Sequence, residues 1–160
     1  MAAKPRKSWR EKLADDKDLP KVVRLDAAQA ARFGGDTLAI AAPCEVDQLM
    51  RSVPRGRVTT INELRSAIAR KHRAAAGCPI TTGIFSWIAA NAANEAAAAG
   101  ESAPTPYWRT LKRGGELNPK YPGGIAGLRR KLAGEGHTFV RRGARTFVRD
   151  YEKALFSPPA

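Results

Sequence analysis

Two helices in succession are encoded in the middle of the chain. Thr60 and Glu63 stand three residues apart, the spacing of a capping box, and apolar residues follow at helical intervals. A Gly-Cys-Pro break ends this segment. A second helix is expected to start at Thr81 or Thr82 and to run through an alanine-rich stretch to Gly100. This is the layout of a helix-turn-helix, although two consecutive helices are a weak signal by themselves.

Shorter elements are expected on the N-terminal side of this pair. Residues 1–20 are polar and charged and are expected to be flexible, with Trp9 as their apolar anchor. Strands are expected over 22–25 and 37–41, and helices over 27–33 and 46–53.

The C-terminal side is expected to hold one helix and one β-hairpin. The helix covers 125–132 and the two strands cover 137–142 and 145–149, followed by a helical turn over 151–155 that Asp150 caps. The whole pattern predicts a mainly α-helical fold with small β elements. A length of 160 residues suits one compact domain with a small extension.

The net charge of +13 is unevenly distributed. Residues 107–160 carry 12 Lys/Arg against 4 Asp/Glu, whereas residues 80–106 carry no Lys/Arg and 2 Asp/Glu. A polyphosphate is the natural partner of such a surface, and a solvated surface without a partner is the alternative.

Several classes of protein are disfavoured by composition. Cys44 and Cys78 have no metal-ligand spacing, and both are expected to be structural residues in a reduced, cytoplasmic setting. No apolar run approaches the roughly 20 residues of a membrane span, and the basic N-terminus lacks the apolar region of a secretory signal. We therefore expect a monomer with no metal, no cofactor and no membrane partner.

Four short motifs follow the second helix in a fixed order. They are Pro106-Tyr107-Trp108-Arg109, Gly115-Glu116-Leu117, Tyr121-Pro122-Gly123-Gly124 and Glu135-Gly136-His137. In order and spacing they resemble the active-site half of the O6-alkylguanine-DNA alkyltransferase family, which carries Pro-Cys-His-Arg, a Tyr-x-Gly-Gly segment and Glu-Gly-His. Val53 to Val58 is similar to that family's entry to the helix-turn-helix, so the resemblance covers roughly residues 43–137.

The resemblance implies a winged helix-turn-helix-like domain that binds double-stranded DNA. It divides the chain into a flexible segment over 1–20, a small α/β extension over 21–42, the DNA-binding domain over 43–137, and a hairpin and tail packed on it over 138–160. It also implies a pocket for a flipped base. The residues that it places in this pocket are Tyr107, Trp108, Arg109, Tyr121, Gly123, Gly124, Glu135 and Asn91.

Two replacements remove the chemistry of the family. Tyr107 stands at the position of the methyl-accepting cysteine, and Trp108 at that of the activating histidine. Alkyl transfer needs a thiolate made by a neighbouring base, whereas a tyrosine hydroxyl has a pKa near about 10 and an indole N–H accepts no proton. The resemblance is therefore strongest to the alkyltransferase-like proteins, which bind damaged DNA without repairing it.

Base flipping is also left open by the sequence. Thr82 stands where the family inserts an arginine into the base stack, and Ile61 stands where it has a pocket tyrosine. The linker between Asn91 and Tyr107 is longer than the family's. Two arrangements of the aromatic residues follow. Either Tyr107, Trp108 and Tyr121 line a cavity, with Glu135 accepting the indole N–H of Trp108, or these rings fill and close the pocket.

The second helix is expected to enter the minor groove, as in the family, because its small residues allow close approach. It carries no Lys or Arg, so basic side chains of other segments would contact phosphates. The expected DNA-contacting residues are Thr81, Thr82, Gly83, Ser86, Ala89, Ala90, Arg55 and Arg57.

The sequence leaves two functions open, and a third is ranked below them. The first is a non-enzymatic DNA-binding protein that senses alkylated or distorted bases, such as O6-alkylguanine, and recruits repair proteins. The second is a basic nucleic-acid-binding or interaction module without lesion recognition. The third is a methyltransferase with a different acceptor residue.

Overall fold

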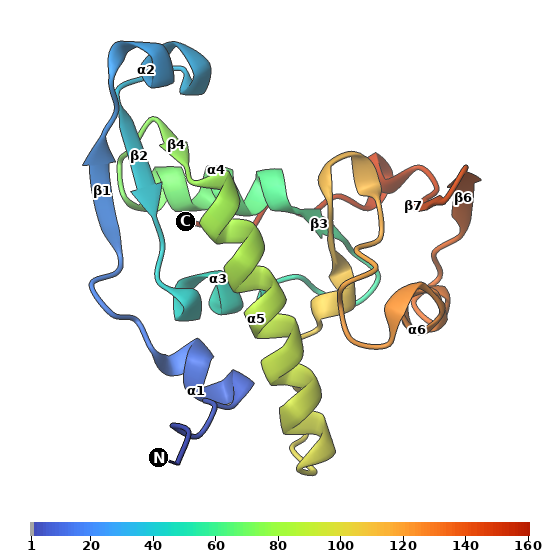
Figure 1. Ribbon diagram of the computed structural model, residues 1–160. Coiled ribbons are helices and arrows are strands. Elements are labelled where there is room, and N and C mark those ends of the chain that lie inside the picture. The colour runs from blue at the N-terminus through green and yellow to red at the C-terminus, as the bar shows by residue number, and fades with distance from the viewer. Residues whose placement is uncertain (1) are drawn as a thin grey trace.

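The computed structural model describes residues 2–160 and is mainly helical, with three small sheets among these residues (Figure 1). The expected fold class is confirmed. Within the described part of the chain, no helix is both long enough and apolar enough to cross a membrane.

Three helices form the centre of the molecule, namely α3 (Pro43–Arg51), α4 (Ile61–Lys71) and α5 (Pro79–Ala98). The first two bury apolar stripes, and Met50 and Leu64 are fully enclosed. Helix α5 begins earlier than expected, at Pro79, because proline is well tolerated in a first helical turn, where its missing N–H has no partner to lose.

Thr60 caps helix α4, as expected. Its hydroxyl accepts a hydrogen bond from the amide of Glu63 at 3.3 Å. The reciprocal bond of the capping box is not made. The Glu63 carboxylate accepts a hydrogen bond from the Ser157 hydroxyl at 2.8 Å instead. This part of the prediction is wrong because the carboxylate has a donor in the C-terminal tail that local sequence does not reveal.

A three-stranded sheet packs beside the helices. Strand β1 (Lys21–Arg24) pairs antiparallel with β2 (Thr37–Ile40), and β2 pairs in parallel with β4 (Ala76–Gly77). Helix α2 (Ala27–Phe33) joins the first two strands. Its predicted bounds, cap and stop are confirmed. A Cβ on Gly77 would lie 2.5 Å from the carbonyl oxygen of Arg65, so only glycine allows strand and helix to approach this closely.

The expectation of a flexible segment over 1–20 is wrong for helix α1 (Trp9–Ala14), which packs against α5. The Glu95 carboxylate of α5 accepts the amide N–H of Trp9 at 3.1 Å. The indole rings of Trp9 and Trp87 meet edge to face, with centroids 4.7 Å apart. The role of Trp9 as the anchor of this segment is therefore confirmed.

The remaining elements lie on the other side of α5 (Figure 1). Strands β3 (Thr59–Thr60) and β5 (Thr110–Leu111) pair in parallel, and helix α6 (Gly124–Ala133) precedes the expected hairpin of β6 (Phe139–Arg142) and β7 (Arg145–Val148). Three short helical turns complete this part, η1 (Tyr107–Arg109), η2 (Arg113–Gly115) and η3 (Tyr151–Ala154). Asp150 precedes the last turn, but its side chain makes no cap bond.

Candidate functional site

An ion pair between Arg109 and Glu135 forms the centre of the motif region. The guanidinium donates from Nη2 to Oε1 of Glu135 at 2.7 Å and from Nε to Oε2 at 3.0 Å. Its Nη1 donates to the carbonyl oxygen of Val53 at 2.9 Å. The side chains of Arg109 and Glu135 are only 14% and 4% exposed, so this pair joins the turn η1, the loop before β3 and the end of α6 inside the protein.

Trp108 also binds Glu135. Its indole Nε1 donates to Oε1 of Glu135 at 3.0 Å, and the hydrogen bond expected from the sequence is thus confirmed. Burial alone raises the pKa of Glu135, but the hydrogen bonds from Arg109 and Trp108 outweigh it and hold the pKa below its usual value. The carboxylate is therefore charged at neutral pH and fully engaged by its neighbours.

Tyr107 and Tyr121 belong to the hydrophobic core. They are 6% and 3% exposed, and their rings meet edge to face with centroids 6.1 Å apart. The Tyr107 hydroxyl donates weakly to the carbonyl oxygen of Pro122 at 3.4 Å, and the Tyr121 hydroxyl donates to Oγ of Ser86 at 3.1 Å. Of the two arrangements that the sequence left open, this geometry fits rings that fill the pocket.

The geometry offers little for nucleophilic chemistry. Burial raises the pKa of Tyr107, and it raises the pKa of Tyr121 to about 12, so neither phenol ionises readily. Cys44 lies at the start of α3 beside Asp16, and its pKa is raised mainly by burial. Cys78 is buried at the N-cap of α5. The raised pKa keeps the Cys44 thiol protonated, so Cys44 supplies no activated thiolate.

The small residues of α5 face the interior. Thr82, Ser86, Ala89 and Ala90 are at most 2% exposed. Thr82 donates its hydroxyl hydrogen to the carbonyl oxygen of Cys78 at 2.6 Å. The expectation that these four residues lie on a DNA-facing surface is wrong. Small side chains suit close approach to any neighbour, and here the neighbours are the core residues of this chain.

The exposed face of α5 carries larger residues that are not among the expected DNA-contacting residues. Ile80 is 71% exposed, Ile84 47% and Trp87 36%. Together with Gly83, Asn118 and Lys120 they line an open groove of about 370 Å³. A Cβ added at Gly83 would meet no atom within 4 Å. The signal available in the sequence was the spacing of three and four residues between Ile80, Ile84 and Trp87, which places them on one helix face.

The other expected site residues are dispersed. Thr81 lies half-buried in the first turn of α5, and Asn91 donates its side-chain amide to the carbonyl oxygen of Trp87 within that helix at 2.9 Å. Gly123 and Gly124 adopt positive φ at the start of α6. Arg55 and Arg57 are exposed but donate to main-chain carbonyl oxygens, Arg55 to Gly134 and Arg57 to Ala154 and Leu155.

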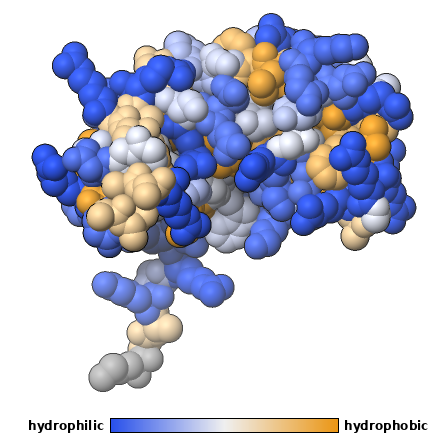
Figure 2. All heavy atoms as spheres, turned by 90° about the horizontal axis from the view of Figure 1, so that it is seen from above, coloured by the Kyte–Doolittle hydropathy of each residue, from blue (hydrophilic) through white to orange (hydrophobic). Residues whose placement is uncertain are grey.

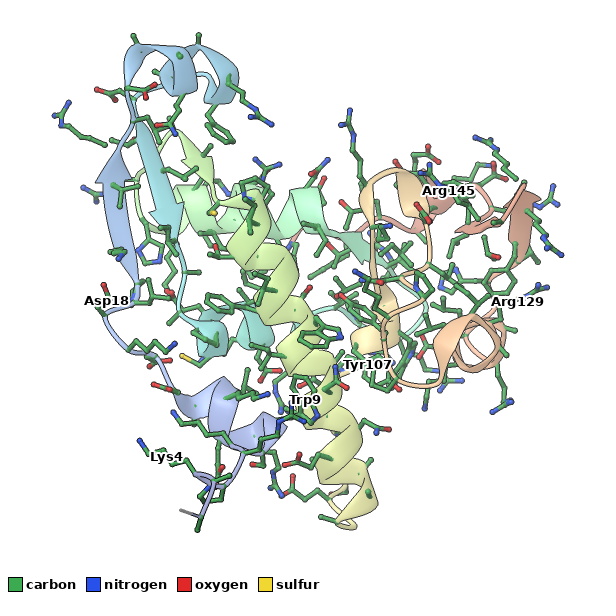
Figure 3. All side chains as sticks on the ribbon, in the orientation of Figure 1. Lys4, Trp9, Asp18, Tyr107, Arg129 and Arg145 are labelled. Carbon is green, nitrogen blue, oxygen red and sulfur yellow. The ribbon has the colours of Figure 1, made fainter. Side chains whose placement is uncertain are left out.

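Cationic side chains gather around α6 and the hairpin. Between Lys120 and Arg149 the chain has eight Lys/Arg and one acidic residue, Glu135, which Arg109 already neutralises. Figure 3 shows Arg129 and Arg145 at the end of the molecule opposite Lys4 and Asp18. Figure 2 shows that on the face seen from above hydrophobic areas are small and interrupted by hydrophilic residues.

Comparisons with known proteins add one structural likeness. The sequence matches no known family model and no curated protein. Among solved structures, S. pombe Atl1, in complex with damaged DNA containing O6-carboxymethylguanine, is similar with a TM-score of 0.44 and 15% identity, over 72% of this chain and 94% of that chain.

Proposed function

We propose that this protein is a non-enzymatic binder of double-stranded DNA. The observation that carries the proposal is the set of eight Lys/Arg between Lys120 and Arg149, of which only Arg145 has a carboxylate of the described residues within 4.0 Å. That carboxylate, Glu116, also pairs with Lys112 at 3.7 Å. Positive charge left without internal partners at one end of a protein is the electrostatic signature of a phosphate-binding surface.

The exposed face of α5 is the element best suited to approach a groove. It carries no charged residue between Pro79 and Asn94, and Lys120 stands at the edge of its groove. Proteins that bind the minor groove frequently place isoleucine or other apolar side chains against the base steps. In this arrangement Ile80 and Ile84 meet the bases, while Lys120 and the cations beyond it meet the phosphates.

Binding without base extrusion is favoured by the buried tyrosines. An extruded base needs a pocket, and the rings of Tyr107 and Tyr121 occupy the place where the sequence motifs put one. We propose a duplex binder that is indifferent to alkylation. Sensing of alkylated bases, with recruitment of repair proteins, is the alternative that the tyrosine variant in the Discussion tests.

A salt titration with a matched pair of variants tests the proposal. About four to six phosphate contacts would give a slope of log K against log salt of roughly −4 to −5 for a plain duplex. Gly83→Glu places a negative charge on the exposed face of α5 without a clash, and Gly83→Gln is the neutral control of the same size. We expect a large loss of affinity for the glutamate variant alone. Salt-independent binding, or equal affinity of both variants, would contradict the proposal.

A further inference from the structure

A second groove lies between α6 and the hairpin, away from the tyrosine cluster. It has a volume of about 650 Å³ and is lined by Ile125, Ala126, Arg129, Arg141, Ala144 and Thr146. One arginine stands on each wall, Arg129 on the helix and Arg141 on strand β6. The two alanines take up little of the groove because their side chains are short.

The arginines of this groove are held in place but are not neutralised. The guanidinium of Arg129 lies over the ring of Phe139 at 5.1 Å, and Nε of Arg141 donates to the carbonyl oxygen of Gly143 at 3.1 Å. No carboxylate of the described residues lies within 4.0 Å of either guanidinium. Most of their N–H donors therefore have no acceptor among residues 2–160.

Further cations continue along the same two elements. Arg130 follows Arg129 on α6. Arg142 follows Arg141 on β6 and lies on the opposite face of the hairpin, over the ring of Phe147 at 5.3 Å, because successive side chains of a strand point to opposite faces. Two guanidinium groups on opposite walls of one groove suit a ligand with repeated phosphates better than one with a single anionic group. Guanidinium groups match phosphate oxygens in a two-pronged geometry that a lysine ammonium does not provide.

We propose that this groove holds the sugar–phosphate backbone of nucleic acid, with Arg129 and Arg141 contacting phosphates from opposite walls. The inference rests on the proposed function and adds a second contact to it, separate from the exposed face of α5. The hairpin then acts as a clamp on the backbone while the helix α5 occupies a groove of the duplex.

The test is a double variant that removes the two charges and keeps polar side chains. Arg129→Gln/Arg141→Gln removes two phosphate contacts, so the slope of log K against log salt should fall in magnitude by about 2, and affinity at about 0.1 M salt should weaken by roughly tenfold to a hundredfold. Arg129→Lys/Arg141→Lys keeps the charges and should keep most of the salt slope. Circular dichroism of each variant checks that the fold is intact.

The matched control removes the same number of positive charges from another part of the surface. Lys21→Gln/Arg24→Gln removes two cations from β1, at the other end of the molecule (Figure 1), where they pair with Asp18 and Asp36. Its salt slope should equal that of the unmodified protein. Equal loss in both double variants would show an effect of net charge alone and overturn the proposal.

Two further outcomes separate the proposals from each other. If the unmodified protein binds duplex and Gly83→Glu abolishes binding while the groove variant keeps its slope, the backbone clamp is wrong and the proposed function stands. If the unmodified protein binds no duplex, both fail. Displacement of the duplex by inorganic phosphate at constant ionic strength would assign the groove to free phosphate instead of a nucleic-acid backbone.

Discussion

Arg109 and Arg129 have the same chemistry and opposite surroundings. Arg109 is almost enclosed and directs its guanidinium donors to Glu135 and to the carbonyl oxygen of Val53. Arg129 is exposed, lies over an aromatic ring and faces no carboxylate of the described residues. An arginine that is paired with a carboxylate inside the protein holds segments of the chain together. An arginine that is oriented but not neutralised is available to a ligand. Stability and the proposed DNA affinity should therefore depend on different arginines.

The largest effect is expected from removing the partner of the inner arginine. Glu135→Ala leaves the Arg109 charge buried without a counter-ion and should lower the free energy of unfolding by about 3–5 kcal/mol in urea denaturation. Glu152→Ala, which removes an exposed carboxylate, is the control and should change stability by less than about 0.5 kcal/mol. Similar stability of both variants would contradict the distinction between the enclosed Arg109–Glu135 pair and charged residues on the surface.

A slightly smaller loss of stability is expected from a change at Tyr107, which tests whether this buried ring supports the fold or binds a base. Tyr107→Ala should lower the free energy of unfolding by about 3 kcal/mol, since a buried ring is replaced by a cavity. The ratio of affinities for plain and O6-methylguanine duplexes should stay the same, and mass spectrometry should find no methyl group transferred to the unmodified protein. A lesion preference that disappears in this variant would favour the damage sensor.

The sequence predicted most of the helices, the caps of α2 and α4 and the hairpin better than it predicted which face of α5 is exposed. Caps and turns depend on residues within four positions, such as Asp26 with Gln29. The hydrogen bond from Trp108 to Glu135 was also predictable, because the motif fixes both positions. The buried face of α5 was not, because a helix of alanine, glycine and threonine has no sharp apolar stripe, and the partners that cover it are distant in the chain.

Helix α1 was missed for a related reason. Six residues are too few to form a stable helix alone, and its stabilising partners Trp87 and Glu95 lie far along the chain. We expect Trp9→Ala to lower the free energy of unfolding by about 1 kcal/mol through loss of the edge-to-face contact. Limited proteolysis should then cut within residues 8–15 faster than in the unmodified protein. Unchanged cleavage would show that Glu95 alone holds α1.

The smallest effect is expected in the pH dependence of stability. The pKa of Glu135 lies below its usual value, so its contribution is complete above about pH 4.5 and is lost as the pH falls through the folded pKa. Burial lowers the pKa of His137 as well, so protonation of the unfolded chain below about pH 6.5 also favours unfolding. Denaturation at several pH values should show stability falling on the acid side. Arg129→Gln/Arg141→Gln should leave that profile unchanged, because arginine does not titrate in this range.

The bond from Glu95 to the start of α1 has a consequence for the order of folding. The acceptor is synthesised 86 residues after the donor Trp9. During synthesis α1 therefore lacks its stabilising partner until α5 has left the ribosome. Contacts of such long sequence separation form slowly, and a short terminal helix that buries none of its residues opens at a low free-energy cost. The N-terminal helix should accordingly exchange its amide hydrogens faster than α4, although both are helical in the folded protein.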